Sequence, residues 1–447
     1  MKTRFKQFDR NTIFLMPPSL EDWLPENHLA RFVMDIVSQL DLRAIKGAYD
    51  GRGSAAHNPE MLLGLLFYGY STGVFASRKI ERATYDSVAF RYIAGNTHPD
   101  HDTICTFRKR FLDQLKPLFL QILTIAHAMG VPKIGKISLD GTKIKANASK
   151  HRALSWGHAN KLEEQLAGEV NELLQMAEQE DAVVVPDGMD VPEEIARRQD
   201  RLAAIAKAKE EIKGRADERY LKEKQEYDYK MQKRLERGKN RGKEPAPPQP
   251  GPQAKDQVNL TDPESRIMPN SSKGFEQAYN AQAAVDVESL LIVASHISQN
   301  PNDKQEIEPA LAEVAKLPGE AAEIEAILAD TGYYSATNVI RCNDKKITPL
   351  IATKRDKHNQ SPSERFTEAP PLKDGADLIE RMKHYLQTRE GRSLYGKRKC
   401  TVEPVFGVIK HVLGFRQFLL RGLEAVKGEW SLVCIAWNIK RLHKITC

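Results

Sequence analysis

The feature that most constrains the fold is a change of pattern after one short strand. Residues 137–144 (Ile-Ser-Leu-Asp-Gly-Thr-Lys-Ile) alternate with a period of two, which predicts a β-strand. Residues 161–239 are instead highly charged and carry apolar side chains at helical spacing, with a Val-Pro-Asp-Gly break at 185–188. A proline-rich run follows at 244–252, and strand-like segments then resume at 279–287, 290–297, 324–329 and 347–352. The sequence therefore predicts an α/β domain that is interrupted after its first strand by a helical hairpin and a stiff linker, together spanning residues 150–258.

Residues 1–130 predict an all-α N-terminal domain. Apolar side chains recur at helical spacing over residues 27–40, 59–68, 77–89 and 103–115. The last of these segments is predicted to begin at a cap formed by Asp102 or Thr103, and its basic residues Arg108, Lys109 and Arg110 are predicted to lie away from its apolar side. Short helices that end in a capped basic helix are similar to a helix-turn-helix layout, so this region is a candidate DNA-binding domain.

The composition excludes several classes of protein. Hydrophobic residues make up 41% and charged residues 28% of the 447, which suits a folded chain rather than a disordered one. The longest apolar runs, at 290–294 and 432–437, are far shorter than the ~20 residues of a membrane span. The N-terminus is basic but leads into polar residues rather than into the apolar core of a secretory signal. The five cysteines are scattered and form no C-x-x-C, so we expect the reducing cytoplasm and no membrane association.

Positive charge is concentrated at the C-terminal end. Residues 391–447 contain 11 lysines and arginines against 3 acidic residues, an excess of 8, while the whole chain has a net charge of only +7. A local basic field of this kind suits a polyanion such as DNA or RNA. The alternative is a solvated helix face that keeps the protein soluble.

Three familiar motifs are not met. The segment Gly391-x-x-x-x-Gly396-Lys397 has the spacing of a phosphate-binding loop, but Arg398 replaces the Ser or Thr that would hold magnesium and no strand precedes it. His98 and His101 lie in a Pro-Asp turn, and no second pair of zinc ligands stands out in the sequence. No G-x-S-x-G nucleophile motif occurs.

Carboxylates at predicted element ends are the remaining candidates for chemistry. Asp140 follows three strand residues, and Asp330 follows the strand 324–329. Carboxylates held by rigid backbone at the rim of a sheet can bind a hard cation, although Asp-Gly and Asp-Thr-Gly are also ordinary turn sequences. Glu403 precedes Pro404 at the start of a predicted helix, where ideal geometry places Lys410 about 20° from it around the axis. A structural N-cap is the alternative role for Glu403.

The three carboxylates in order resemble a known catalytic set. Asp140 in Ser-Leu-Asp-Gly-Thr-Lys, Asp330 in Ala-Asp-Thr-Gly-Tyr-Tyr and Glu403 in Val-Glu-Pro-Val-Phe-Gly resemble the DDE triad of bacterial insertion-sequence transposases. The resemblance implies an RNase H-like mixed sheet flanked by helices, of the retroviral-integrase type, over residues 131–447. It also implies that the triad is catalytic and holds two Mg²⁺ ions ~3.5–4 Å apart, for which Mn²⁺ could substitute. Asp140 would bridge the two ions.

The basic residues around Glu403 fit the family pattern only in part. Related transposases often show Tyr-x-x-Arg-x-x-x-Glu-(six residues)-Lys. Here Glu403 and Lys410 keep their spacing, but the arginine position falls on Lys399, and Arg398 lies one residue too far from Glu403. The resemblance makes Arg398, Lys399 and Lys410 candidates for DNA binding, with Lys410 beside a phosphate, in addition to the basic residues 108–110.

The resemblance also implies a substrate and a partner. The expected activity is binding to the terminal inverted repeats of the protein's own element, followed by metal-dependent cleavage of the DNA ends and strand transfer into a target. Two DNA ends suggest a homodimer in the synaptic complex, in the nucleoid-associated cytoplasm of a bacterium. The alternatives are a non-catalytic DNA-binding regulator derived from a transposase, an RNase H-like nuclease without strand transfer, and a scaffold built on the hairpin.

Overall fold

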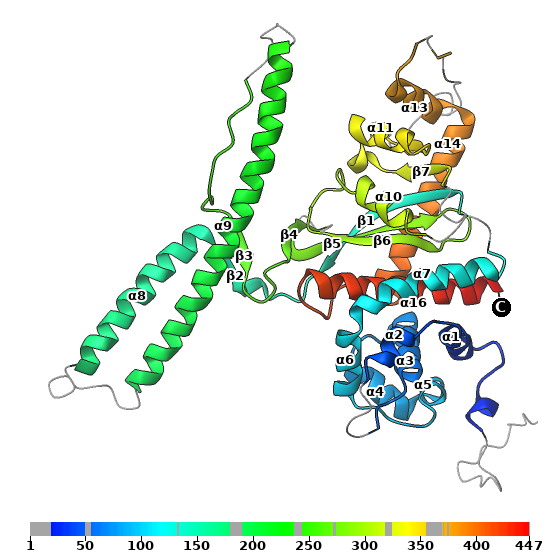
Figure 1. The fold of residues 1–447 in the computed structure, drawn as a ribbon, viewed down its shortest axis with the longest axis horizontal. Helices are drawn as coiled ribbons and strands as arrows, with labels where there is room; N and C mark the ends of the chain where they lie inside the picture. The colour runs from blue at the N-terminus through cyan, green and yellow to red at the C-terminus, as the bar shows by residue number, and fades with distance from the viewer. Residues whose placement is uncertain are drawn as a thin grey trace, which may run out of the picture.

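A computed structural model describes residues 19–49, 55–131, 134–178, 190–236, 244–270, 274–317, 324–354, 369, 371–372 and 375–446. The described residues form a body with a central sheet and a long helical arm that leaves one side of it (Figure 1). The predicted break at 185–188 lies outside the described residues. No helix among the described residues is long and apolar enough to span a membrane.

The body contains one mixed six-stranded sheet, as the alternation of strands and helices predicted. Its strands are β1 (Lys136–Lys145), β4 (Arg266–Pro269), β5 (Phe275–Asp286), β6 (Ile292–Ser298), β7 (Ala326–Ala329) and β8 (Thr348–Ile351). They run in the order β4-β5-β1-β7-β8, with β6 also paired to β5. β5 is antiparallel to β1 and β6, whereas β7 is parallel to both β1 and β8. The predicted hairpin of two strands at 279–297 is therefore confirmed as β5 and β6.

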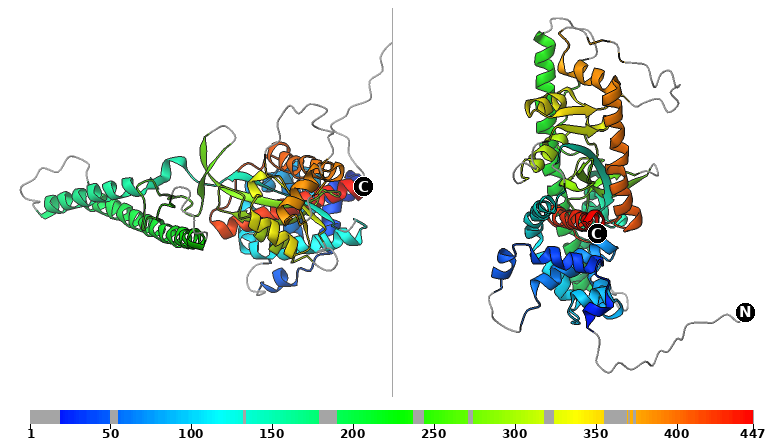
Figure 2. Two further views of the ribbon diagram at one scale, coloured as in Figure 1. Left: turned by 90° about the horizontal axis from the view of Figure 1, so that it is seen from above. Right: turned by 90° about the vertical axis from the view of Figure 1, so that its right-hand side faces the viewer.

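Helices cover both faces of this sheet. On one side lie α10 (Ile307–Val314) and α11 (Ala336–Asp344); on the other lie α13 (Leu378–Gln387), α14 (Arg389–Gly396) and α15 (Val402–Gly407) (Figure 2). Residues 277–286 of β5 are buried without a break, and many of them are small, which suits a strand covered on both faces.

The N-terminal region is entirely helical in its described part, as predicted. It contains η1 (Leu20–Trp23), α1 (Leu29–Ser38), α2 (Arg43–Gly47), α3 (Pro59–Thr72), α4 (Ser77–Asp86), α5 (Val88–Ile93), α6 (His101–Arg110) and α7 (Leu112–Ala128). Asn58 caps α3 and Pro59 occupies its first turn, as the Asn-Pro pair predicted.

The C-terminal helix α16 (Leu423–Thr446) joins this helical region to the sheet. It lies between the N-terminal helices and the strands (Figure 1) and packs on α3, α7 and β6. Its residues Trp430, Val433, Cys434 and Trp437 are buried, which confirms that they are core residues. One hydrophobic core contains side chains both of the N-terminal helices, such as Phe67 and Phe119, and of the sheet and α16, such as Leu139 and Trp430. The boundary expected at residue 130 therefore crosses a shared interior.

The basic helix differs from its prediction in two ways. Its cap is Asp100, whose carboxylate accepts from the backbone N–H of Thr103 at 2.6 Å, rather than Asp102 or Thr103. It ends at Arg110, because Phe111 leaves helical geometry (φ −112°, ψ 22°) before α7 begins. The prediction that Arg108 lies away from the apolar side is wrong, since only 5% of that residue is exposed.

Arg108 is buried because it belongs to a polar network between α3, α6 and α16. Its Nη1 donates to the Tyr70 hydroxyl at 3.0 Å and to the Phe75 carbonyl at 3.1 Å. The Tyr70 hydroxyl donates to Oε1 of Glu429 at 2.9 Å. Oε2 of Glu429 accepts the backbone N–H groups of Leu419 and Leu420 at 2.9 and 3.0 Å. Burial raises the pKa of Glu429, and these donors together with Arg108 oppose that effect. Arg108 therefore fastens the N-terminal helices to α16 and is not part of the exposed basic surface of α6.

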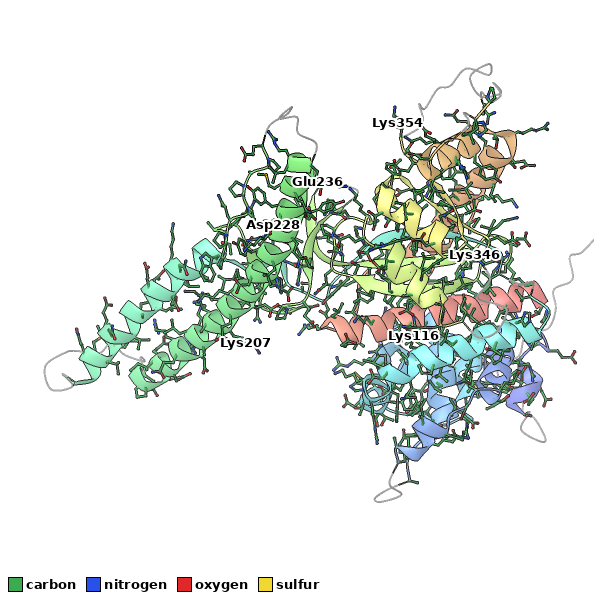
Figure 3. The ribbon with its side chains drawn as sticks, turned by 45° about the horizontal axis from the view of Figure 1, so that its top comes forward. Lys116, Lys207, Asp228, Glu236, Lys346 and Lys354 are labelled. Atoms are coloured by element: carbon green, nitrogen blue, oxygen red, sulfur yellow. The ribbon has the colours of Figure 1, made fainter. Side chains whose placement is uncertain are left out.

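The arm is the predicted helical hairpin. It consists of α8 (Trp156–Glu178) and α9 (Val191–Glu236), which bury a thin seam that includes Leu166, Ile205 and Ile212. A two-stranded sheet of β2 (Ala153–Ser155) and β3 (Gln257–Asn259) closes its root. Charged side chains such as Lys207 and Asp228 project along α9 (Figure 3).

The proline-rich run is extended, as predicted, but it is not a free linker. It returns along the C-terminal half of α9 (Figure 1), where Pro245 and Pro248 line a groove with Tyr227. Arg219 of α9 pairs with Asp256 at 2.8 Å and donates to the Gly251 carbonyl at 3.3 Å, which fixes the end of the run. The proline-rich run thus forms one side of the arm.

The buried network leads to a stability prediction. Replacing Glu429 by Ala leaves the Tyr70 hydroxyl and two backbone N–H groups without their acceptor and the buried Arg108 without its counter-charge, so we expect a loss of about 3–5 kcal/mol in the free energy of unfolding. The matched control is Glu424→Ala on the same helix, whose side chain is 80% exposed and for which a change within about 0.5 kcal/mol is expected. Urea unfolding measures both, and equal stabilities would contradict the network.

Candidate active site

The register of two parallel strands brings the two aspartates together. Leu139 of β1 pairs with Ala329 of β7, and Asp140 and Asp330 are the next residues along each strand. Neighbouring strands lie ~4.8 Å apart, and residues at equal register point to the same face, so the two carboxylates are neighbours. Asp330 follows its strand, as predicted. Asp140 lies inside β1 rather than at its end. It is the first residue of β1 beyond the part that pairs with β7.

Glu403 joins this pair through an arginine. It lies in the first turn of α15, which packs on β1. Nη2 of Arg398 is 3.0 Å from Oε1 of Glu403, and Nη1 is 3.6 Å from Oδ2 of Asp140. The Arg398 side chain is 12% exposed, whereas that of Glu403 is 48% exposed. One guanidinium therefore bridges two of the three predicted carboxylates, and the third lies beside them.

Local backbone geometry explains why Arg398 occupies this position although its spacing is one residue too long. Residues Lys397–Cys400 form a 3-10 turn (η5), and Thr401 then adopts φ −109° and ψ −82° before α15 begins. This turn and break replace a continuous α-helix, in which Lys399 would face Glu403. Lys399 is exposed instead.

Lys410 is fixed by the strand that carries Asp140. It lies in a π-helical turn (η6, Val408–Val412), so the ideal-helix relation expected between it and Glu403 does not hold. Its Nζ donates to Oγ1 of Thr142 and to the Lys143 carbonyl, both at 2.9 Å. Burial lowers the pKa of this amine. Lys410 ties the segment after Glu403 to β1, and its contact with a phosphate stays a prediction.

The site carries an excess of negative charge. Burial raises the pKa of Asp140 to about 7; the backbone N–H of Gly141, which donates at 2.8 Å, and Arg398 lower it, while Asp330 and Asp303 raise it further. A buried carboxylate beside two others is stabilised by a cation. The donors are all oxygen, which suits Mg²⁺ or Mn²⁺.

The arrangement is not a closed cage for metal. Among the residues that the structure describes, no three His, Cys, Asp or Glu side chains are grouped so that they could hold one ion. Because Arg398 lies between Asp140 and Glu403, Glu403 can share an ion with Asp140 only if the guanidinium moves aside. Asp140 and Asp330 are neighbours in the sheet, and among the described residues the structure places no guanidinium between them.

A polar cluster behind Asp140 was missed by the sequence analysis. Asp303, in the loop between β6 and α10, accepts from Asn280 and Gln282 of β5, both at 2.7 Å. The Tyr333 hydroxyl donates to Gln282. The sequence signal was Gly141, because a glycine inside a strand marks the close approach of another group.

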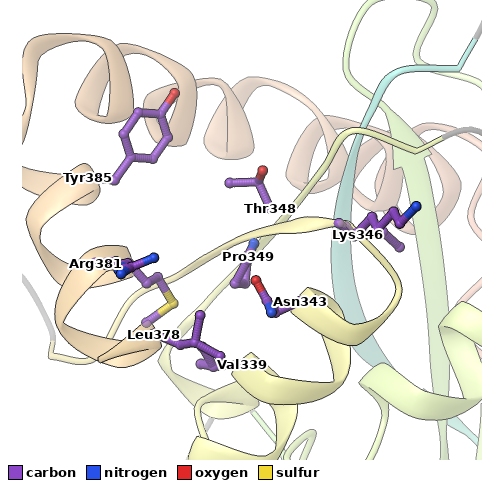
Figure 4. A pocket seen from close by; sticks show the side chains of 10 residues that line it. Val339, Asn343, Lys346, Thr348, Pro349, Leu378, Arg381 and Tyr385 are labelled. Carbon is purple, nitrogen blue, oxygen red and sulfur yellow. The ribbon is translucent and has the colours of Figure 1, made fainter. Parts of the chain in front are cut away.

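The remaining candidates lie elsewhere on the molecule. Lys109 and Arg110 are exposed on α6, and the Arg110 guanidinium lies over the Tyr49 and Phe111 rings at 5.1 and 5.3 Å. A cavity of about 380 Å³ lies between α11, β8 and α13 (Figure 4). It is lined by residues such as Asn343, Arg381 and Tyr385, and the three carboxylates take no part in it.

Comparison with protein families gives two matches. Residues 18–110 match a family described as a transposase domain (DUF772), and residues 248–439 match the transposase DDE domain. The chain belongs to the DDE transposases of insertion sequences. An RNase H-like fold is what this family implies, and the mixed sheet with helices on both faces agrees with it. No curated protein and no solved structure gave a significant match.

The match covers two of the three carboxylates of this transposase. Asp330 and Glu403 lie inside residues 248–439, whereas Asp140 precedes the arm and lies outside them. The position of Asp140 beside Asp330 in the sheet is therefore what links it to the DDE domain. Membership of the family implies divalent metal ions and a DNA substrate in general terms.

Gly141 allows a direct test of the packing behind Asp140. A Cβ at this position would lie 2.1 Å from Nε2 of Gln282 and 2.7 Å from Oδ1 of Asp303, so Gly141→Ala should lower the stability by about 1–3 kcal/mol. Gly168→Ala in α8 is the control, because nothing lies within 4 Å of its Cβ and alanine favours a helix by about 1 kcal/mol. The urea unfolding midpoint should be lower than that of the wild type for Gly141→Ala and higher for Gly168→Ala. An unchanged midpoint for Gly141→Ala would contradict the packing.

The raised pKa of Asp140 predicts a pH-dependent stability in EDTA. Between the usual value of 3.8 and about 7, the folded protein keeps a proton that the unfolded chain releases, so stability falls as the pH rises. In the Asp140→Asn variant the side chain carries no charge at any pH. Above pH 7 this variant should be more stable than the wild type by a few kcal/mol, because each unit of pKa shift corresponds to about 1.36 kcal/mol.

Urea unfolding at pH 4.5–8 measures this difference. The exposed Asp344→Asn should follow the wild type at every pH. A constant difference between wild type and Asp140→Asn across this range would show that Asp140 titrates normally.

Proposed function

We propose that this protein binds the terminal inverted repeats of its own insertion element, cleaves the DNA ends and joins them to a target. The observation that carries the proposal is the convergence of Asp140, Asp330 and Glu403: the first two are neighbours in the sheet, and the Arg398 guanidinium bridges Asp140 and Glu403. These three side chains are the proposed catalytic residues and metal ligands.

The metal would be a pair of Mg²⁺ ions, or Mn²⁺ in their place. Bound there, the ions would activate the attacking water or DNA 3′-hydroxyl and stabilise the leaving oxygen. Asp140 is the proposed shared ligand, because it lies between Asp330 on the neighbouring strand and Glu403 on α15. The raised pKa of Asp140 means that metal binding would also release a proton below about pH 7.

Arg398 has two proposed partners. Its guanidinium pairs with carboxylates, and it is also the group best suited to bind a phosphate through two N–H donors. We infer that DNA and metal together move Arg398 from Asp140 and Glu403 to the phosphate next to the cleaved bond. Its neighbour Lys399, exposed on η5, would contact the backbone further along.

A second DNA contact is proposed at α6. Lys109 and Arg110 are exposed near the end of this helix, and the C-terminal basic residues add charge to the body. Binding to the phosphate backbone releases counterions, so affinity should fall steeply as salt rises. Two ends must be joined in one event, and a homodimer in the synaptic complex meets that need. The proposed location is the bacterial cytoplasm, at the nucleoid.

The test is cleavage of a duplex that carries the element's own end. Asp140→Asn and Asp330→Asn should each bind this duplex with unchanged affinity and show no nicking in Mg²⁺, because each removes a negative ligand without removing a DNA contact. Asp344→Asn, exposed at the end of α11, should cleave like the wild type.

The alternatives give different results in the same assay. A non-catalytic regulator binds the end duplex but does not cut it, even as wild type. A nuclease without strand transfer cuts the end but gives no joined product from a pre-cut end. Undiminished cleavage by Asp140→Asn would refute the proposed site.

A further inference from the structure

A fourth acidic residue lies directly behind the proposed metal ligands. Side chains alternate along β1, so Asp140 and Thr142 face α15 while Gly141 and Lys143 face the opposite side of the sheet. On that side, Oδ1 of Asp303 accepts from Asn280 and Gln282 at 2.7 Å and lies 3.4 Å from Nζ of Lys143. Asn280 and Gln282 are the residues paired with Lys143 and Gly141 in the sheet.

The loop that carries Asp303 is fixed by a second buried carboxylate. Glu306 is 2% exposed and accepts from His296 at 2.8 Å, from the Ser298 hydroxyl at 2.7 Å and from the Asn300 amide at 3.0 Å. Its backbone N–H donates to the Asp303 carbonyl at 3.0 Å. Asp303 is therefore held in a defined place relative to β5 and β6.

Two glycines allow this carboxylate to approach the proposed ligands closely. A Cβ on Gly141 would lie 2.7 Å from Oδ1 of Asp303, so the peptide that follows Asp140 packs directly on it. A Cβ on Gly332 would lie 2.9 Å from Oδ1 of Asp330 and 3.7 Å from Oδ2 of Asp303. Asp303 thus reaches the backbone beside both aspartates, although it faces the sheet from the other side.

We propose that Asp303 is a positioning residue for the metal centre: it fixes the Asp140–Gly141 backbone through Asn280 and Gln282, and its charge strengthens cation binding by Asp140 and Asp330. This inference rests on the proposed function. Lys143, which lies on the same strand as Asp140, pairs with Asp303. Its positive charge partly cancels the effect of the Asp303 charge on cation binding. Residues that orient metal ligands without touching the ion typically contribute about 10–100-fold to metal affinity.

The role of the charge separates this proposal from a purely structural one. Asp303→Asn removes a negative charge and should weaken Mn²⁺ binding by about 10–100-fold. Lys143→Gln removes the opposing positive charge and should tighten Mn²⁺ binding severalfold. If the cluster only supports the fold, both substitutions disturb the same contacts, and both should weaken binding in proportion to their loss of stability.

The experiment is calorimetric titration of the full-length protein with Mn²⁺, without DNA, for wild type, Asp303→Asn, Lys143→Gln and the exposed control Asp344→Asn. Urea unfolding of each protein shows that it is folded. Opposite shifts for Asp303→Asn and Lys143→Gln, with Asp344→Asn unchanged, support the proposal. An unchanged affinity in Asp303→Asn, or weaker binding in both variants, overturns it.

The two proposals can fail separately. If the wild type binds Mn²⁺ but leaves the end duplex uncut, the proposed function fails and the affinities still decide the role of Asp303. If the wild type binds no Mn²⁺, both proposals are overturned.

Discussion

The parallel pairing of β1 with β7 is the constraint on which the site depends. A shift of one residue in this register would turn one aspartate to the other face of the sheet, because side chains alternate along a strand. The apolar residues before the aspartates fix the register, since Leu139 and Ala329 are fully buried. The core therefore positions two like charges side by side. The hydrogen-bond donors and the cation around them offset their mutual repulsion. Gly141 N–H and Gly332 N–H each donate to one of these carboxylates, and Arg398 lies against Asp140.

Periodicity predicted β1, β5, β6, β7 and β8, and the ends of predicted elements made Asp140, Asp330 and Glu403 candidates. Neither pattern predicted β4 or the contacts made between distant segments. The alternation in residues 137–144 predicted β1, and the mixed sheet flanked by helices, which the family resemblance implied, was confirmed. The burial of Arg108 depends on Glu429, far away in the sequence, and a helical pattern contains no information about that partner. Asp303 was missed for the same reason, because its partners are on β5 and β1.

Motif spacing failed where the backbone departs from regular geometry. The family's motif spacing favoured Lys399 over Arg398, and ideal helix geometry placed Lys410 about 20° from Glu403 around the axis. A 3-10 turn before Glu403 and a π turn after it change both relations, the first by tightening the chain and the second by widening it. Such turns are often found at functional sites, and here they flank the one predicted catalytic residue that is carried by a helix.

A long arm interrupts the sheet without separating its carboxylates. The arm leaves after β1 and returns before β5, and the β2–β3 pair closes its root, so the two strands still pair in full. On the other side of the sheet, Glu429 and Arg108 join α16 to the helix that carries Lys109 and Arg110. The basic end of α6 is thereby held at a fixed distance from the carboxylates. A DNA end bound at α6 would thus be connected to the site through this buried, hydrogen-bonded network, whereas the arm joins the body at the β2–β3 pair.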